Sequence, residues 1–131
     1  MIFVDTGAWF ATFVPNDADH SAASDWLDAN SEPLLTTDYV LDELLTLMKM
    51  RGEFERALRL GEELLNEAVA QFEWVTPADV RGAWEAFGRF RDKGWSFTDC
   101  VSRAVMQRLG VSAAFSFDQH FHQFGDILVV P

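Results

Sequence analysis

Four acidic residues occupy positions where a carboxylate would be costly to bury or could serve in binding or catalysis. Asp5 ends the apolar opening of the chain, and Asp118 follows another short apolar run. Asp99 lies near the start of a helical pattern, and Glu43 lies inside a helical pattern that is otherwise apolar. Carboxylate oxygens are the ligands that hard cations such as Mg²⁺ and Mn²⁺ prefer. A fold that brings these acids together would form a cation site.

Strand-like and helical segments alternate along the chain. The expected strands, of which the second could be a connector, are Met1–Asp5, Pro33–Thr36, Phe72–Val75, Val111–Phe117 and Ile127–Val130. The expected helices are Ala8–Val14 after a Thr6-Gly7 turn, His20–Asn30, Tyr39–Met50, Phe54–Val69, Pro77–Lys93, Ser96–Leu109 and Asp118–Phe124. This alternation predicts an α/β fold in one domain, residues 1–131: a three-layer α/β/α sandwich with a central, mainly parallel sheet of four to five short strands.

The expected sheet offers a way for distant acids to meet. In open α/β sheets, ligands bind beyond the carboxyl ends of the strands. Asp5 closes the first strand, and Asp118 follows the strand-like segment near the end of the chain. Asp99 lies in the first turn of a helix that a site beside the sheet could reach. We therefore expect these three acids, with Glu43, to converge at one end of the sheet.

Each acid also has a purely structural explanation. Asp5 could hydrogen-bond the turn after its strand. Asp99 completes a capping box with Ser96, and Asp118 could be the N-cap of the short helix that it begins. Glu43 and Asp42 flank opposite edges of one apolar helical stripe, so periodicity does not choose between them. The functional interpretation therefore depends on the whole set of acids.

Composition narrows the class of protein. Of 131 residues, 49% are hydrophobic, which favours a folded globule, and no segment approaches the roughly 20 apolar residues of a membrane helix. The single cysteine, Cys100, excludes an internal disulfide, and we expect a cytoplasmic protein with no membrane association. The net charge of −11 counts against binding RNA through a basic surface, unless several of the carboxylates hold a cation.

The remaining reactive side chains favour structural roles. His120 and His122 are two residues apart and do not share a helix face, so we expect surface or packing roles for both. Cys100 has no evident activating base, and we expect it to be buried. Asp5-Thr6-Gly7 is also found in aspartic proteases, but the small proteases of that kind are nearly all β. A haloacid-dehalogenase phosphotransferase needs a second Asp where this chain has Gly7.

Four sequence motifs together resemble those of the PIN-domain nucleases. They are Ile2-Phe3-Val4-Asp5-Thr6-Gly7, the helical pair Asp42-Glu43, Ser96-Phe97-Thr98-Asp99-Cys100, and Phe115-Ser116-Phe117-Asp118-Gln119-His120-Phe121. The motifs occur in the family's order and at about its spacing, from one end of the chain to the other. Within that family the chain is most similar to the VapC-type toxins of toxin–antitoxin pairs.

The resemblance implies a function and a site. Asp5 and Asp99 match the family's principal metal ligands, Glu43 its helix acid and Asp118 its fourth acid, with Thr6, Ser96 and Thr98 as supporting polar residues. It implies an endoribonuclease that uses Mg²⁺ or Mn²⁺ to hydrolyse RNA, leaving a 3′-hydroxyl and a 5′-phosphate. It also implies a VapB-type antitoxin that covers the site, and a homodimer.

One alternative belongs to a different functional class. A PIN-fold protein that no longer cleaves could serve as a protein- or RNA-binding module. Geometry separates the two possibilities. Carboxylates that converge within a few ångströms around an open cleft favour the enzyme, whereas scattered carboxylates favour the module.

Overall fold

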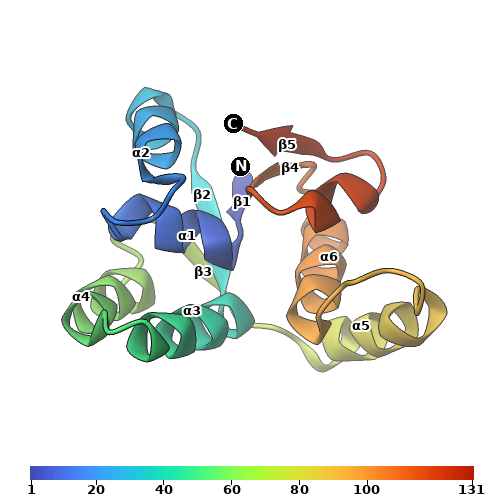
Figure 1. The fold of residues 1–131 in the computed structure, drawn as a ribbon. Helices are drawn as coiled ribbons and strands as arrows, with labels where there is room; N and C mark the ends of the chain where they lie inside the picture. Colours follow the sequence, from blue (N-terminus) through green and yellow to red (C-terminus); the bar gives the residue numbers. More distant parts are fainter.

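The computed structural model describes residues 1–131 and contains a five-stranded parallel sheet flanked by helices (Figure 1). The strands are β1 (Ile2–Val4), β2 (Leu34–Thr37), β3 (Gln71–Glu73), β4 (Ala113–Phe115) and β5 (Leu128–Val130). The helices are α1 (Thr6–Phe13), α2 (His20–Ala29), α3 (Asp38–Met50), α4 (Phe54–Leu65), α5 (Pro77–Arg89), α6 (Phe97–Leu109) and the 3₁₀ helix η1 (Gln119–Gln123). The predicted α/β/α architecture is confirmed.

Strand β1 lies in the middle of the sheet, whose order is β3-β2-β1-β4-β5. Phe3 is in register with Leu35 of β2 on one side and with Ala114 of β4 on the other. All three residues of β1 are buried, which matches a parallel strand covered on both faces. The carboxyl ends of β1 and β4 therefore lie side by side, and the acids that follow these two strands are brought together.

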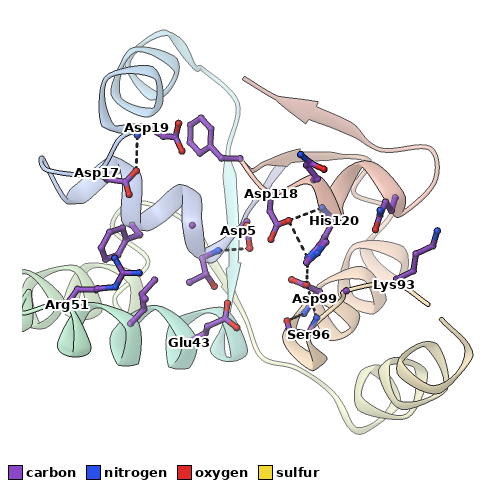
Figure 2. A pocket seen from close by; sticks show the side chains of 18 of the residues that line it. Asp5, Asp17, Asp19, Glu43, Arg51, Lys93, Ser96, Asp99, Asp118 and His120 are labelled. Atoms are coloured by element: carbon purple, nitrogen blue, oxygen red, sulfur yellow. Dashed lines mark hydrogen bonds and ion pairs between the residues drawn. The ribbon is translucent and has the colours of Figure 1, made fainter. Parts of the chain in front are cut away.

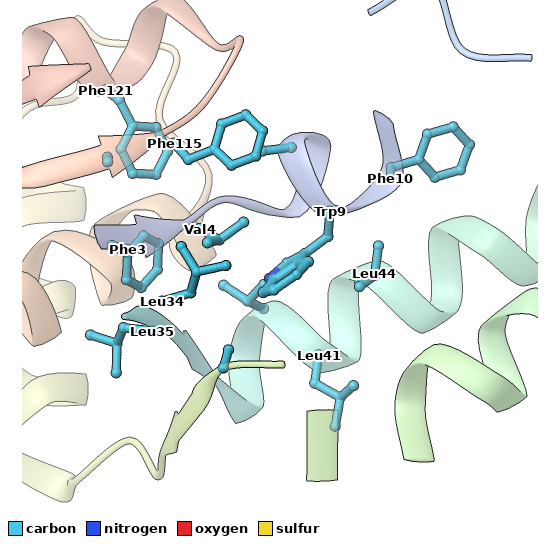
Figure 3. Close-up of a cluster of buried hydrophobic side chains, with 14 of the residues drawn as sticks. Phe3, Val4, Trp9, Phe10, Leu34, Leu35, Leu41, Leu44, Phe115 and Phe121 are labelled. Carbon is cyan, nitrogen blue, oxygen red and sulfur yellow. The ribbon is translucent and has the colours of Figure 1, made fainter. Parts of the chain in front are cut away.

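Helices cover both faces of this sheet. Figure 1 shows α1 to α4 on one side and α5 and α6 on the other. Large apolar side chains fill the layers, and Trp9 of α1 is 1% exposed where it packs beside Leu44 of α3 (Figure 3). The Trp9 indole N–H donates to Thr36 Oγ1 at 3.3 Å, so its polar atom is also satisfied. The core thus fixes α1 and α3 against the sheet end that carries the acids.

Two boundaries differ from the sequence-based expectation because of specific hydrogen bonds. Thr6 begins helix α1 instead of forming a turn, since Asp5 caps the helix by accepting a hydrogen bond from Thr6 N–H. Helix α5 ends at Arg89 and not near Lys93. The chain leaves the helix there to bury Trp95, whose indole N–H donates to Gln123 Oε1 at 3.0 Å. This exit carries residues 90–96 toward the acidic end of the sheet.

The remaining differences lie at the ends of elements. Helix α4 ends at Leu65 where the pattern extends to Val69, and β4 is shorter than the expected Val111–Phe117 segment. Helix α6 ends as predicted at Gly110, whose φ of 67° lies in the left-handed region that glycine adopts at little cost. No helix combines the length and the apolar character needed to cross a membrane.

Candidate active site

An open cleft of about 1020 Å³ lies at the carboxyl ends of β1 and β4 (Figure 2). Seven of its 19 lining residues are acidic, and among them are the four predicted site acids, Asp5, Glu43, Asp99 and Asp118. Three hydrophobic side chains line the cleft, so its surface is mainly polar. The acids that the sequence places far apart thus face one shared space.

Asp5 is a buried acid of the cleft, with 8% of its surface exposed. Its backbone N–H donates to the carbonyl oxygen of Phe115 at 3.1 Å, which continues the ladder between β1 and β4. Its Oδ1 accepts from Thr6 N–H at 2.8 Å, and its Oδ2 accepts from the Ser116 hydroxyl at 3.0 Å. The side chain is therefore held from both sides and points into the cleft.

Asp99 and Asp118 form a tight group with His120. Ligand atoms of these three residues all lie within 4.8 Å of one another. Asp99 comes from the first turn of α6, where it completes a capping box with Ser96. Asp118 is the N-cap of η1 and accepts from His120 N–H at 2.9 Å. Asp5 lies outside this group and is linked to it through Ser116, whose Oγ accepts from Asp118 N–H at 3.0 Å.

Helix N-termini orient three of the four acids. Asp5 caps α1, Asp118 caps η1, and Asp99 is the third residue of α6. Backbone N–H groups at a helix N-terminus are free to donate and carry partial positive charge, which favours carboxylates there. The helix-capping roles expected for Asp99 and Asp118 are therefore found in the structure, and Asp5 also caps a helix. The same hydrogen bonds orient the three carboxylates at the cleft.

The other predicted residues lie at different distances from this centre. Glu43 of α3 is half-buried and lines the cleft opposite α6, whereas Asp42 is exposed and does not line it. Thr6 and Ser96 line the cleft. Thr98 lies in the first turn of α6 but is not among the lining residues.

The electrostatics of the cleft act most strongly on Asp5. Burial raises the pKa of Asp5 from 3.8 to about 7, and the negative charges of Asp99 and Asp118 add to the increase. Hydrogen bonds from Ser116 and Thr6 oppose this shift. A nearby cation would favour the ionised form, so ionisation of Asp5 and cation binding are expected to support each other.

The donor set fits a hard divalent cation. Carboxylate oxygens from separate elements face one cleft, as Mg²⁺ and Mn²⁺ require. Thr6 Oγ1 is buried beside Asp5 and has no hydrogen-bond partner. Because buried hydroxyls rarely remain unpaired, a water held by a bound cation would be a suitable partner. Asp99, Asp118 and His120 offer ligand atoms within 4.8 Å of one another, and the carboxylates of Asp5 and Glu43 line the same cleft, so these residues could hold such an ion.

Comparisons with known proteins agree with this geometry. The family model of the PIN domain matches residues 2–127. Over 131 residues the chain is 34% identical to the 23S rRNA-specific endonuclease VapC20 of Mycobacterium tuberculosis, covering 100% of this chain and 99% of that protein. The chain belongs to the VapC-type ribonucleases of the PIN-domain family. In this VapC-type chain the carboxylates of Asp99 and Asp118 lie close together at an open cleft that Asp5 and Glu43 also line, which favours the enzyme, and the chain is a toxin-class endoribonuclease.

A second relative and two solved structures also match this VapC-type ribonuclease. It is 28% identical over 123 residues to a VapC ribonuclease of Archaeoglobus fulgidus, covering 90% of this chain and 77% of that one. The crystal structure of M. tuberculosis VapC20, a sarcin-ricin loop cleaving toxin, matches with a TM-score of 0.92 and 32% identity over the full length of both chains. The structure of FitAB bound to a DNA fragment matches with a TM-score of 0.73 at 12% identity, which shows a shared fold alone.

Sequence reasoning missed two residues of the site of this VapC-type enzyme. Ser116 joins Asp5 to Asp118, although it appears in the sequence only as a small residue in an apolar run. For His120 the expectation was a surface or packing role; its side chain is about 31% exposed, and its Nδ1 also contacts the carboxylates of Asp99 and Asp118. The sequence signal for this contact was the position of His120 two residues after Asp118, because residues in the first turn of a helix lie beside the side chain that caps it.

Proposed function

We propose that this VapC-type ribonuclease hydrolyses RNA at the cluster of Asp5, Asp99, Asp118 and Glu43, with Mg²⁺ or Mn²⁺ as cofactor. The observation that carries the proposal is the convergence of Asp5, Asp99 and Asp118 at the ends of β1, β4 and α6. PIN nucleases use a divalent metal. A bound ion would polarise the scissile phosphate and activate a water as nucleophile.

The chain's own residues prepare this chemistry in two ways. Ser116, Thr6 and Ser96 hold the acids in place by hydrogen bonds. Glu43 approaches from the opposite wall, where it can orient a water across the cleft from Asp99. In the hydrolysis, a water oxygen bonds to phosphorus as the bond to the 3′ oxygen breaks, and the products are a 5′-phosphate and a 3′-hydroxyl.

RNA binding must occur in spite of the net charge of −11. The cleft contains two strongly basic side chains, Arg51 at the end of α3 and Lys93 in the segment between α5 and α6. Figure 2 shows them on opposite sides of the acids. We propose that these cations contact phosphates on either side of the scissile bond, because phosphate contacts position a nucleic acid without reading its sequence.

The proposed substrate is the sarcin-ricin loop of 23S ribosomal RNA. The proposal is supported by VapC20, which is described as 23S rRNA-specific and as cleaving this loop. That protein matches the present chain over its full length at a TM-score of 0.92. Arg51 and Lys93 would bind backbone phosphates of such an RNA hairpin. Other residues at the rim of the cleft would distinguish this hairpin from other RNAs.

Protein partners follow from the toxin class. VapC toxins pair with antitoxins and bind RNA. For this chain we propose a VapB-type antitoxin that covers the cleft, and a homodimer. Two exposed apolar areas support the existence of protein contacts: Leu58 and Leu65 on α4, which are more than half exposed, and Trp84 and Phe87 on α5, whose ring centroids lie 6.5 Å apart.

Cleavage of a sarcin-ricin hairpin by antitoxin-free protein tests the proposed activity. We expect a discrete 5′-phosphate product with Mg²⁺ or Mn²⁺, none with EDTA, and a large loss of rate for Asp5→Asn and Asp99→Asn. Asp42→Asn is the matched control, because this neighbouring acid is exposed outside the cleft. Metal-dependent cleavage of other RNAs but not of the hairpin would contradict the substrate alone. Equal cleavage in EDTA would contradict the metal site.

A further inference from the structure

His120 contacts two of the site acids at once. Its Nδ1 lies 3.1 Å from Asp99 Oδ2 and 3.3 Å from Asp118 Oδ1 (Figure 2). Ionised carboxylates only accept hydrogen bonds, so these contacts require a hydrogen on Nδ1. One N–H group is therefore placed between two carboxylates that come from different elements, α6 and the N-cap of η1.

These contacts use one oxygen of each carboxylate and leave the other oxygen open. Asp99 Oδ2 also accepts from Ser96 N–H at 2.9 Å, and Asp118 Oδ1 also accepts from His120 N–H at 2.9 Å. No protein group donates to Asp99 Oδ1 or to Asp118 Oδ2. The imidazole therefore fixes both side chains without occupying the oxygens that remain free to bind a cation.

A glycine in the facing segment makes room for the ring. A Cβ atom placed on Gly94 would lie 3.1 Å from His120 Nε2, closer than nearly all ordinary contacts. Gly94 belongs to the segment that leaves α5 early and then enters α6. The ring is thus seated between this segment and the two acids, with about 31% of the side chain exposed.

Asp118 is the acid that most needs such support. Its side chain is 41% exposed, compared with 10% for Asp99, and it lies at the start of a short 3₁₀ helix. An exposed carboxylate close to another carboxylate is driven away by charge repulsion and is free to rotate into solvent. A shared N–H donor opposes both effects.

We propose that His120 is a positioning residue, which holds Asp99 and Asp118 at the spacing that a divalent cation requires. This inference rests on the proposed metal-dependent function of the same cleft. Groups that hydrogen-bond metal ligands typically change metal affinity by about 10- to 100-fold when they are removed. His120 acts through the two carboxylates, and its contribution should therefore appear in metal binding itself, before any RNA is present.

Two conservative variants separate positioning from other roles. In the His120→Asn variant, the side-chain amide nitrogen is bonded to Cγ as Nδ1 is, so a donor is retained near the two acids. In the His120→Gln variant the amide nitrogen reaches the position of Nε2, and the donor between the acids is lost. His120→Ala removes both nitrogens. His122→Ala is the matched control, because His122 is exposed on the same short helix and does not line the cleft.

The experiment is calorimetric titration of the full-length, antitoxin-free protein with Mn²⁺ at pH 8, with thermal unfolding in EDTA to compare folding. We expect Mn²⁺ affinity about 10- to 100-fold weaker for His120→Ala and His120→Gln, and within about threefold of wild type for His120→Asn and His122→Ala. All variants should unfold at similar temperatures in EDTA, because the ring lies at the rim of the cleft.

Each other outcome has a definite meaning. Unchanged affinity in His120→Ala, with Mn²⁺ still bound by the wild type, would overturn the inference and leave the metal site intact. Equal weakening in His120→Asn and His120→Ala would show that the imidazole nitrogen itself is required, and positioning would be wrong. No Mn²⁺ binding by the wild type would contradict the proposed metal site and the inference that depends on it.

Discussion

The Ser116 hydroxyl donates a hydrogen bond to Asp5 Oδ2 at 3.0 Å and joins the carboxyl end of β4 to that of β1. The Ser116 Oγ atom also accepts from Asp118 N–H at 3.0 Å. Ser116 is 4% exposed, and Asp5 is nearly as deeply buried. One small side chain therefore links a buried acid to an acid at the cleft rim, and both acids depend on it for their orientation.

Replacement of Ser116 by alanine should weaken cation binding. The hydrogen bond from Ser116 lowers the pKa of Asp5, so its loss should raise that pKa further and make the ionised form rarer at neutral pH. A hydrogen bond to a charged group contributes about 1.5–3 kcal/mol, which corresponds to at least a tenfold effect. Mn²⁺ titrations of Ser116→Ala between about pH 6 and 9 would measure it. An unchanged pH dependence would show that Ser116 does not tune Asp5.

The stability of the metal-free protein should fall as pH rises from about 4 to 7. The pKa of Asp5 is about 7 in the folded protein, whereas its ordinary value of 3.8 applies to the unfolded chain. The folded state therefore holds the Asp5 proton more tightly than the unfolded state does. The resulting stabilisation is complete below pH 3.8 and is lost as pH rises through 7, by up to about 1.4 kcal/mol per pH unit. Urea unfolding in EDTA, compared with Asp5→Asn, would show it. Parallel curves for the two proteins would contradict the raised pKa.

Cation binding should reverse this loss of stability at neutral pH. Mg²⁺ or Mn²⁺ at about a hundredfold excess over its dissociation constant would stabilise the folded state by about 2.7 kcal/mol, provided that the unfolded chain does not bind it. We expect a higher melting temperature with metal at pH 8 and a much smaller gain in Asp5→Asn. Identical melting curves with and without metal would be inconsistent with a preformed site.

Arg51 and Lys93 should affect RNA binding more than the chemical step. Loss of either proposed phosphate contact should raise KM with little change in kcat. It should also reduce the slope of log affinity against log salt concentration by about 1, as expected for one phosphate contact. Steady-state cleavage at several salt concentrations by Arg51→Ala and Lys93→Ala provides the measurement. Arg59→Ala is the control, because Arg59 is exposed on α4 away from the cleft. A similar effect of all three variants would show that only net charge matters.

The sequence predicted the architecture because the local signals were strong. Alternating segments indicated the sheet, Gly110 ended α6, and Ser96 with Asp99 began it. The meeting of Asp5 and Asp118 followed from their positions after parallel strands, whereas Asp99 and Glu43 reach the same cleft from helices α6 and α3. Periodicity did not separate Glu43 from Asp42, because both flank the same apolar stripe. The structure separates them through the orientation of α3, which turns Glu43 into the cleft and Asp42 to solvent.

The residues that were missed depend on contacts between distant segments. His120 reaches Asp99 across 21 positions in the chain, and Ser116 reaches Asp5 across 111. No local pattern encodes such pairs. The early end of α5 has a similar origin, because burial of Trp95 against Gln123 competes with continued helix. Asp99 and Asp118 each use one carboxylate oxygen for helix capping, and the other oxygen accepts no hydrogen bond from the protein, so a capping role leaves that oxygen free.

The central claim is that Asp5, Asp99, Asp118 and Glu43 hold a divalent cation in the cleft. Anomalous diffraction from crystals grown with Mn²⁺ tests it most directly, because it locates the ion independently of activity. We expect a strong anomalous peak among the carboxylates of Asp5, Asp99 and Asp118 at pH 8, and its loss in Asp99→Asn. Strong Mn²⁺ peaks elsewhere on the protein, with none in the cleft, would contradict the account.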